Sequence, residues 1–402
     1  MRVTAVETIR PRIQSNLCFV RLHTDTGLTG LGESFFGAPA VETHIHETVA
    51  PLLLGMDDPA PQRVAALLTP YVGYQGGGAE LRGNGAIDIA LWDLIGKATD
   101  LPLARLLGGP VRDRIRTYNT CAGGRYVSTT TRQNSSNWGL PTDAGEYEDL
   151  YAFLHHPARL ARELSDEGTR GMKIWPFDQA AEESNGTDIS PRALAAGLDI
   201  VAAIRAEVGF EMDLMIELHG LWTRTAAAKI ARALAEFRPY WIEDPLRPDA
   251  ADALGVLRAE IDIPIATGET CIGRRGFLPL FQRGAVDVAT LDIGWTGGIT
   301  EAAKIASLAD AYSVPIAPHD CTGPVSLAVA THLVCSQPNG LLQETARSFV
   351  RTWYPTLVEG LPELIPGEIV VPTAPGHGVH VRDNLVPDDL ATQRISRLSD
   401  QL

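Results

Sequence analysis

Residues 213–245 read DLMIELHGLWTRTAAAKIARALAEFRPYWIEDP. A short apolar run ends on Glu217, a stretch with helical spacing follows, and a second apolar run ends on Glu243. Short apolar runs alternate in the same way with helices of about ten to fifteen residues over most of the chain. This alternation is typical of β-α-β units around a parallel sheet, so an α/β fold is expected here.

The spacing of the expected strands favours a closed barrel over an open sheet. Each strand ends on a polar residue, and these residues are Lys173, Glu217, Glu243, Glu269, Asp292, His319 and Glu344. They are separated by 44, 26, 26, 23, 27 and 25 positions. A spacing of about 25 accommodates one strand, one helix and two loops. With a further strand at Ile115–Tyr118, the pattern predicts an eight-stranded (β/α) barrel of the modified TIM type.

The N-terminal residues follow a different pattern. Residues 1 to about 35 alternate apolar and polar side chains, with Thr26-Gly27 between two such runs, which predicts antiparallel strands. Helical spacing follows over residues 41–69 and 85–107, and Gly108-Gly109-Pro110 ends it. An N-terminal α+β unit is therefore expected before the barrel.

Three regions are expected from these patterns: the α+β unit over residues 1–112, the barrel over 113–350, and a C-terminal segment over 351–402. The last contains strand and turn signals, and we expect it to cross back onto the N-terminal unit. Two irregular stretches, 123–148 and 178–188, are interpreted as loops over a site or as insertions.

Charge and composition exclude several classes of protein. The chain has 34 Lys and Arg against 49 Asp and Glu, a net charge of −15, which argues against a nucleic-acid partner. No apolar run approaches the roughly 18 residues of a membrane helix, and the first residues lack a signal-peptide core, so no membrane association and a cytoplasmic location are expected. The five scattered cysteines are interpreted as reduced core thiols.

The glutamates at the ends of three successive strands predict a metal site. In a β/α barrel the carboxyl ends of the strands meet at one face, so Glu217, Glu243 and Glu269 are expected to lie close together. Three carboxylates would repel one another and lose solvation unless a cation lay between them. Oxygen ligands favour Mg²⁺, while an iron or zinc site using His219 and His319 with a carboxylate is the alternative.

Two histidines are candidate proton-transfer groups. Asp292 and His319 end neighbouring strands, and a carboxylate beside an imidazole fixes its tautomer and raises its basicity, so His319 is a candidate base. His219 lies two residues after Glu217, and if the strand continues that far, alternation turns both side chains to the barrel mouth. His219 is therefore a candidate acid.

Several motifs together resemble the enolase superfamily, mandelate racemase subgroup. They are GAIDIALWDL at 85–94, LLGG at 106–109, WIEDP at 241–245, GET at 268–270 and GGIT at 297–300. The resemblance implies that the N-terminal unit caps the barrel and that Glu217, Glu243 and Glu269 bind Mg²⁺. It also implies that Asp292 and His319 form the base pair, that Glu344 hydrogen-bonds an enediolate, and that the chemistry begins with removal of a proton α to a carboxylate.

One departure from the family pattern narrows the expected reaction. The racemases carry Lys-x-Lys on the second barrel strand, whereas this chain has Lys173-Ile174-Trp175, and an indole cannot accept the proton. Lys173 is expected to neutralise the substrate carboxylate. Glu217-Leu218-His219 is similar to the ligand-x-His pattern of sugar-acid dehydratases, although those relatives commonly have Asp at the first position.

The resulting hypothesis is a Mg²⁺-dependent dehydratase that converts an acid sugar, an aldonate or aldarate, to a 2-keto-3-deoxy acid. His219 or His319 would protonate the departing hydroxyl. The alternatives are a cycloisomerase that opens an anhydro sugar acid by the same elimination, and a non-catalytic relative that binds sugar acids. Specificity is expected to depend on residues 33–36 and 123–148, and the resemblance implies a homo-oligomer.

Overall fold

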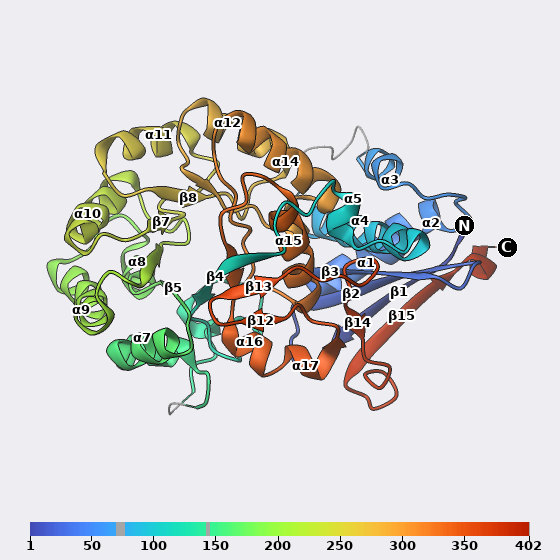
Figure 1. Cartoon of the computed structure of the whole chain (residues 1–402), viewed down its shortest axis with the longest axis horizontal. Helices are drawn as coiled ribbons and strands as arrows, with labels where there is room; N and C mark the ends of the chain where they lie inside the picture. Colours follow the sequence, from blue (N-terminus) through green and yellow to red (C-terminus); the bar gives the residue numbers. More distant parts are fainter. Residues whose placement is uncertain (70–76, 142–144, 402) are drawn as a thin grey trace.

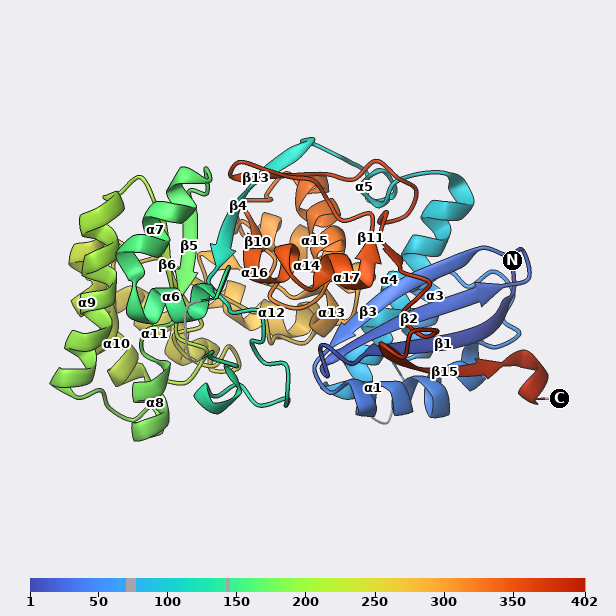
Figure 2. The same cartoon turned by 90° about the horizontal axis from the view of Figure 1, so that it is seen from below.

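The structure, a computed structural model, describes residues 1–69, 77–141 and 145–401. An N-terminal antiparallel sheet with its helices, here called the cap, lies beside a β/α barrel (Figures 1 and 2). The strands of the cap are β1 Val3–Pro11, β2 Leu17–Thr24, β3 Thr29–Phe35 and β15 Ala391–Arg397, in the sheet order β15-β1-β2-β3. The antiparallel strands predicted over the first 35 residues are confirmed.

The helices of the cap cover one face of this sheet. They are α1 Ala38–His44, η1 Ile45–Val49, α2 Ala50–Leu53, α3 Pro61–Leu67, α4 Ala79–Thr99 and α5 Leu103–Leu106. The helical spacing predicted over 41–69 is interrupted after α2. The helix predicted from Gly85 begins six residues earlier, at Ala79.

Two glycines on β3 allow α4 to lie directly on the sheet. A Cβ atom at Gly30 would lie 2.0 Å from the carbonyl oxygen of Ala90, and one at Gly32 would lie 1.9 Å from that of Ala86. No side chain fits at either position. The backbone of α4 therefore contacts β3, and Ile87 and Leu91 of α4 pack with Val20 of β2 in the core of the cap.

The barrel strands are parallel and follow one another in chain order. They are β4 Arg114–Thr120, β5 Gly171–Ile174, β6 Asp213–Glu217, β7 Trp241–Glu243, β8 Ile265–Thr267, β9 Val288–Ala289 and β10 Gln343–Thr345. Between β9 and β10 a single bridge residue, Ile316, pairs with Ala289 and Gly340. Because β10 pairs with β4, the ring is closed, and the predicted barrel is confirmed.

Helices surround the barrel (Figure 1). They are α6 Asp149–His155, α7 Pro157–Asp166, α8 Asp178–Ser184, α9 Pro191–Val208, α10 Arg224–Leu234, η3 Ala235–Phe237, α11 Ala251–Glu260, α12 Gly273–Gln282, α13 Ile293–Thr296, α14 Ile299–Ala311, α15 Pro324–Ser336, α16 Arg347–Arg351 and α17 Tyr354–Leu357. Residues 178–188, predicted as a loop, begin with α8. Residues 123–141 are irregular apart from η2 Ser135–Asn137, and residues 142–144 of that predicted loop lie outside the described residues.

The C-terminal segment runs along the barrel before it reaches the cap. Its elements before β15 are β11 Val358–Glu359, β12 Leu364–Ile365, β13 Glu368–Val370 and β14 His380–Val381, and η4 Leu398–Gln401 follows. β13 pairs with β4 of the barrel, and β15 then pairs with β1 over Ala5–Pro11. We propose that the regions divide near residues 112 and 350, since β4 begins at Arg114 and α16 at Arg347.

Two buried carboxylates of the cap bind the first turns of barrel helices. Glu33 of β3 accepts hydrogen bonds from Val325 N at 2.9 Å and Ser326 N at 3.1 Å at the start of α15. Asp88 of α4 accepts one from Thr300 N, 2.8 Å away, at the start of α14. Free N–H groups and a partial positive charge are available at a helix N-terminus, so both carboxylates attach the cap to the barrel.

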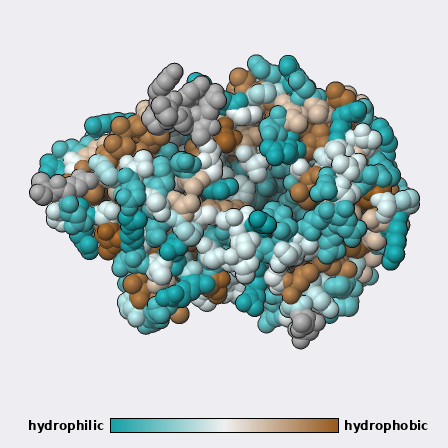
Figure 3. Space-filling view, turned by 180° about the vertical axis from the view of Figure 1, so that it is seen from behind, coloured by the Kyte–Doolittle hydropathy of each residue, from teal (hydrophilic) through white to brown (hydrophobic). Residues whose placement is uncertain are grey.

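Within the described residues, no helix is both long and apolar enough to cross a membrane. Hydrophilic side chains cover much of the face in Figure 3, with hydrophobic ones scattered among them. The five cysteines are free, and four of them are buried, as expected for reduced core thiols.

Candidate active site

The residues predicted from the strand ends lie at the carboxyl end of the barrel. Lys173 is on β5, Glu217 and Glu243 end β6 and β7, and Glu344 is on β10. The other three lie beyond their strands: Glu269 is two residues after β8, Asp292 three after β9, and His319 three after the bridge residue Ile316. The loops direct these side chains back toward the barrel axis, where all seven residues form one connected group.

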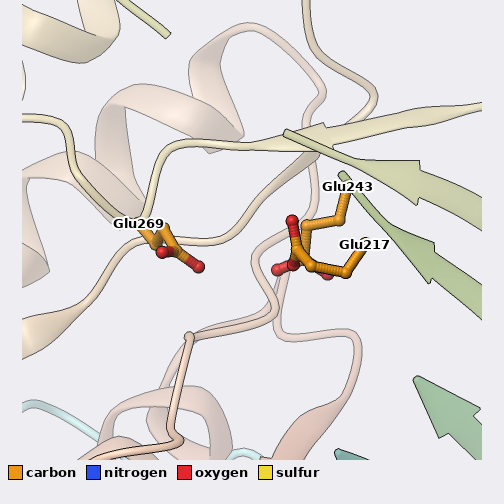
Figure 4. Close-up of side chains that lie close together, drawn as sticks. All are labelled: Glu217, Glu243 and Glu269. Carbon is orange, nitrogen blue, oxygen red and sulfur yellow. The ribbon is translucent and has the colours of Figure 1, made fainter. Parts of the chain in front are cut away.

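The three glutamates face one another (Figure 4). Each offers one carboxylate oxygen, and these atoms lie within 4.8 Å of one another. Glu217 and Glu243 are 1% and 0% exposed, and Glu269 reaches them from the loop after β8. Glu217 Oε1 accepts hydrogen bonds from Leu218 N and His219 N, whereas Glu217 Oε2 has no hydrogen-bond partner within the described residues.

The electrostatics of this cluster fit a bound cation. Burial, with the charges of Glu217 and Glu344, raises the pKa of Glu243 well above its usual range. Burial also raises the pKa of Glu269. Burial opposes ionisation of Glu217, but the positive charges of His219 and Lys173 outweigh it and lower its pKa. Close buried carboxylates of this kind form a candidate site for a hard metal ion.

Lys173 lies between the cluster and Glu344. Its Nζ is 2.9 Å from Glu243 Oε1, 3.3 Å from Glu217 Oε2 and 2.8 Å from Glu344 Oε1. Burial disfavours the ammonium, but the surrounding carboxylates raise the pKa of Lys173 well above its usual range. Lys173 is therefore a buried cation surrounded by three carboxylates.

Glu344 is held on three sides. Lys173 and the hydroxyl of Thr120 donate to its Oε1, and Asp320 N donates to its Oε2 at 2.7 Å. Burial would raise its pKa, but Lys173 and His319 lower the pKa of Glu344 to about 2. Sequence reasoning missed Thr120 because the strand was predicted to end at Tyr118. Thr120 pairs with Lys173 across β4 and β5, so extending the strand would have placed it in the mouth.

His319 and Asp292 lie in contact, as the sequence predicted. His319 Nδ1 is 2.8 Å from Asp292 Oδ2, and Asp292 Oδ1 accepts from Trp295 N at 2.8 Å. The other ring nitrogen, His319 Nε2, is 3.5 Å from Glu269 Oε2. Because Nδ1 faces the carboxylate, Nε2 is the atom that faces the glutamate cluster. Burial disfavours the charged imidazole, but Glu269 and Asp292 raise the pKa of His319 well above its usual range.

His219 reaches the mouth by a different route from the predicted one. β6 ends at Glu217, and His219 has a φ of 49°, so its side chain is placed by a left-handed turn instead of by strand alternation. His219 Nδ1 lies 2.7 Å from Asp178 Oδ2, and Nε2 lies 3.3 Å from Gln133 Nε2. Burial opposes the charge, but Asp178 and Glu217 raise the pKa of His219 to about 10.

Aromatic residues line the side of the mouth near His219. Trp175, the first residue after β5, is 1% exposed. Its ring packs against His219 at 5.8 Å between centroids, against Tyr126 at 5.2 Å and against Phe153 at 5.2 Å. Trp175 therefore belongs to an aromatic wall beside His219.

The two segments predicted to set specificity border this mouth. Gln133, from the irregular segment after β4, is beside His219. Phe36 lies 5.5 Å from the ring of Trp295, whose ring in turn is 4.9 Å from that of His319. One segment therefore approaches each histidine.

Comparisons with known proteins identify the family to which the chain belongs. Residues 2–108 match the family model for the mandelate racemase / muconate lactonizing enzyme N-terminal domain, and residues 156–385 match the enolase C-terminal domain-like model. The first match includes β1 to α5 of the cap, and the second extends from α7 to β14.

Curated relatives and solved structures extend over nearly the whole chain. A D-galactonate dehydratase of Ralstonia nicotianae is 32% identical over 96% of this chain and 94% of its own. One of Xanthomonas oryzae pv. oryzae is 33% identical over 81% of this chain and 77% of its own. An enolase of the mandelate racemase subgroup from Agrobacterium tumefaciens is 41% identical, with a TM-score of 0.88 over 99% of this chain and 100% of that one.

The family models, the nearly complete overlap with these relatives and the shared architecture lead to one assignment. The chain belongs to the enolase superfamily, in its mandelate racemase / muconate lactonizing enzyme group.

Proposed function

We propose that this protein is a Mg²⁺-dependent carbon–oxygen lyase that dehydrates an acid sugar, an aldonate or aldarate, to a 2-keto-3-deoxy acid. The relatives named D-galactonate dehydratase support this class of reaction. The observation that carries the proposal is the 3.5 Å between His319 Nε2 and Glu269 Oε2, which brings a candidate base to the edge of the carboxylate cluster.

Glu217, Glu243 and Glu269 are proposed to hold the metal ion. Their oxygens suit a hard dication, and three protein ligands leave coordination positions for water and substrate. When bound there, Mg²⁺ supplies positive charge that offsets the negative charge developing on the substrate carboxylate. Lys173, now shared among the glutamates, would then be free to bind the same carboxylate.

His319 is proposed to remove the α-proton through Nε2, while Asp292 holds Nδ1 and fixes the ring. A proton next to a carboxylate is weakly acidic, so the enediolate must be stabilised as it forms. Lys173 supplies a buried charge for this purpose. Glu344 is proposed to hydrogen-bond the enediolate, which requires a proton on its carboxyl group. A substrate anion that replaces Glu344 as the partner of Lys173 would raise the pKa of Glu344, so that this carboxyl could take the required proton from solvent.

Collapse of the enediolate expels the β-hydroxyl, which needs a proton to leave as water. His219 and His319 are the candidate donors for that proton. The reaction then yields an enol, which tautomerises to the 2-keto-3-deoxy acid.

A screen tests the proposal. The protein with Mg²⁺ is incubated with a library of aldonates and aldarates that includes D-galactonate, and 2-keto acid formation and product mass are measured. A product lighter than its substrate by one water supports dehydration. A product of unchanged mass from an anhydro sugar acid would identify a cycloisomerase, and tight binding without turnover would identify a non-catalytic relative.

We also propose a cytoplasmic homo-oligomer. Free cysteines are the usual state in a reducing compartment, which supports the location. The self-association follows from the family alone, and light scattering of the purified protein tests it. A monomer at all concentrations would contradict it.

A further inference from the structure

We propose that Trp241 is a positioning residue that decides which oxygen of Glu243 a metal ion can reach, and that it thereby favours Mg²⁺ over Ca²⁺. The indole contacts neither the ion nor the substrate, and it acts through one hydrogen bond from the interior of the barrel. This inference rests on the metal site of the proposed function. It goes beyond that site by naming the side chain that sets its preference between the two ions.

Trp241 lies one layer below the glutamates. It begins β7 and Glu243 ends it, so the alternation of a strand turns both side chains into the barrel. Both residues are 0% exposed. Trp241 belongs to a buried cluster of the barrel interior, together with Tyr118, Met215, Ala266, Val288, Ala317 and Leu342. The indole is therefore part of the floor on which the glutamates lie.

The indole donates a hydrogen bond to one oxygen of Glu243 only. Trp241 Nε1 lies 2.9 Å from Glu243 Oε2, and an indole N–H can donate but cannot accept. The ring is held by an edge-to-face contact with Tyr118, at 5.4 Å between centroids. Because the donor is fixed in the floor, Oε2 of Glu243 turns toward the floor, which leaves Oε1 for the mouth.

The oxygens of Glu217 are divided in the same way. Its Oε1 accepts hydrogen bonds from the backbone N–H groups of the two residues that follow it, at 3.0 and 2.8 Å. The opposite oxygens, Glu243 Oε1 and Glu217 Oε2, both approach Lys173 Nζ, at 2.9 and 3.3 Å, so they point to one place. Glu269 faces this pair (Figure 4). Each buried glutamate thus presents one oxygen to a cation and gives the other to an N–H donor.

One oxygen from each glutamate suits Mg²⁺ better than Ca²⁺. Mg²⁺ requires a near-octahedral shell and keeps several waters, so single carboxylate oxygens are sufficient for it. Ca²⁺ takes about six to eight oxygens and can bind both oxygens of one carboxylate. A donor that holds Glu243 Oε2 removes a ligand from the larger ion and none from the smaller one. Without the indole N–H, the carboxylate of Glu243 could rotate and bind Ca²⁺ through both oxygens.

The experiment measures metal affinity in the absence of substrate. Metal-free wild-type protein and Trp241→Phe are titrated calorimetrically with MgCl₂ and, separately, with CaCl₂. We expect the variant to bind Mg²⁺ about 10-fold more weakly, because the ligand is no longer oriented, and to keep its affinity for Ca²⁺. The dissociation constant for Ca²⁺ divided by that for Mg²⁺ should therefore fall about 10-fold.

A second replacement keeps the size of the ring, since phenylalanine also leaves a space in the floor. Incorporation of 3-benzothienylalanine at position 241 puts sulfur in place of the indole N–H and should lower the same ratio. Trp353→Phe is the matched control, because Trp353 is also buried and its Nε1 has no hydrogen-bond partner in the described part of the chain. Tyr118→Phe alters the same floor without removing a donor to Glu243. Both controls should keep the wild-type ratio.

Equal losses of affinity for the two ions, or an unchanged ratio in the benzothienylalanine protein, would overturn the role of Trp241. The same fall in Trp353→Phe would do so too, because it would assign the effect to lost ring volume. A wild-type protein that binds neither ion would overturn both the metal site and this inference. A wild-type protein that binds Mg²⁺ but dehydrates no acid sugar would overturn the proposed function alone, and the shifted ratio would still support Trp241.

Discussion

At the scale of single residues, the chemistry of the mouth depends on which atom each side chain presents. The strand-end rule identified the glutamate cluster and the His319–Asp292 pair from sequence, because parallel strands must deliver their last residues to one face. It could not find Asp178, which is on a helix after β5. The segment that contains Asp178 is polar and shows no regular spacing of apolar residues, because only Asp178 and Ala181 of α8 are buried.

The placement of His219 shows why a correct residue can follow from an incomplete premise. Alternation required β6 to continue past Glu217, but the strand ends there and His219 adopts a positive φ. A non-glycine residue in this conformation needs support from its surroundings. Here the support includes the hydrogen bond from His219 N to Glu217 Oε1, and such a contact cannot be predicted from the order of residues alone.

The first prediction concerns the base. His319→Asn should lower kcat by about 10³-fold or more, because an amide cannot accept the α-proton, while Mg²⁺ affinity stays unchanged. Steady-state kinetics and calorimetric titration with Mg²⁺ measure the two effects. Exchange of the α-hydrogen with D₂O should also stop in this variant, and normal activity would refute the role of the His319–Asp292 pair.

The second prediction concerns the metal. Mg²⁺ at 100 times its dissociation constant should raise the free energy of unfolding by about 2.7 kcal/mol, because it binds the folded state alone. Denaturant titrations with and without Mg²⁺ measure this shift. Glu269→Gln should reduce it, since one ligand oxygen is lost, whereas Glu183→Gln, which changes an exposed glutamate of α8, should keep it. An equal shift in the Glu269 variant would place the ion elsewhere.

At the scale of elements, the periodicity of apolar residues predicted which segments are strands and which are helices. It did not predict which of these elements pack against each other. The glycines of β3 read as ordinary strand residues, and nothing in the pattern of residues 29–35 shows that α4 lies against them. The seventh strand of the barrel was correctly placed by spacing, although it contributes only the bridge residue Ile316. The number of residues between apolar runs predicts the order of strands and helices. How closely two elements pack depends on the volume of the side chains between them.

The third prediction follows from that contact. Gly32→Ala should lower the free energy of unfolding by about 1–3 kcal/mol or more, because its Cβ would lie 1.9 Å from the carbonyl oxygen of Ala86. Chemical denaturation measures the loss. The matched control is Gly276→Ala in α12, where the nearest atom would be 3.5 Å away. That variant should be neutral or up to about 1 kcal/mol more stable. Equal effects at the two sites would contradict the close contact.

At the scale of the whole molecule, buried acids attach the cap to the barrel. Burial raises the pKa of Glu33 from 4.5 to about 7 and that of Asp88 from 3.8 to about 6. An acid with a higher pKa in the folded state binds more protons when folded. Its contribution to stability is therefore complete below the unfolded pKa and is lost as the pH rises toward the folded one.

The fourth prediction uses this sign. The contribution of Glu33 to the free energy of unfolding should decrease as pH rises from about 4.5 to about 7, so the stability of Glu33→Gln relative to the wild-type protein should increase over this range, because the titrating group is gone. Urea titrations across this range measure both slopes. Identical slopes in the wild-type and Glu33→Gln proteins would contradict the prediction.

The pairing of β15 with β1 has a consequence for biosynthesis. Because β1 is synthesised before the barrel and β15 after it, the outer edge of β1 has no partner strand while the barrel is being made. Unpaired strand edges recruit foreign strands. A chain truncated before residue 391 would lack β15, so that this edge would stay unpaired. The truncated protein should bind chaperones and aggregate, even though it contains every residue of the catalytic mouth.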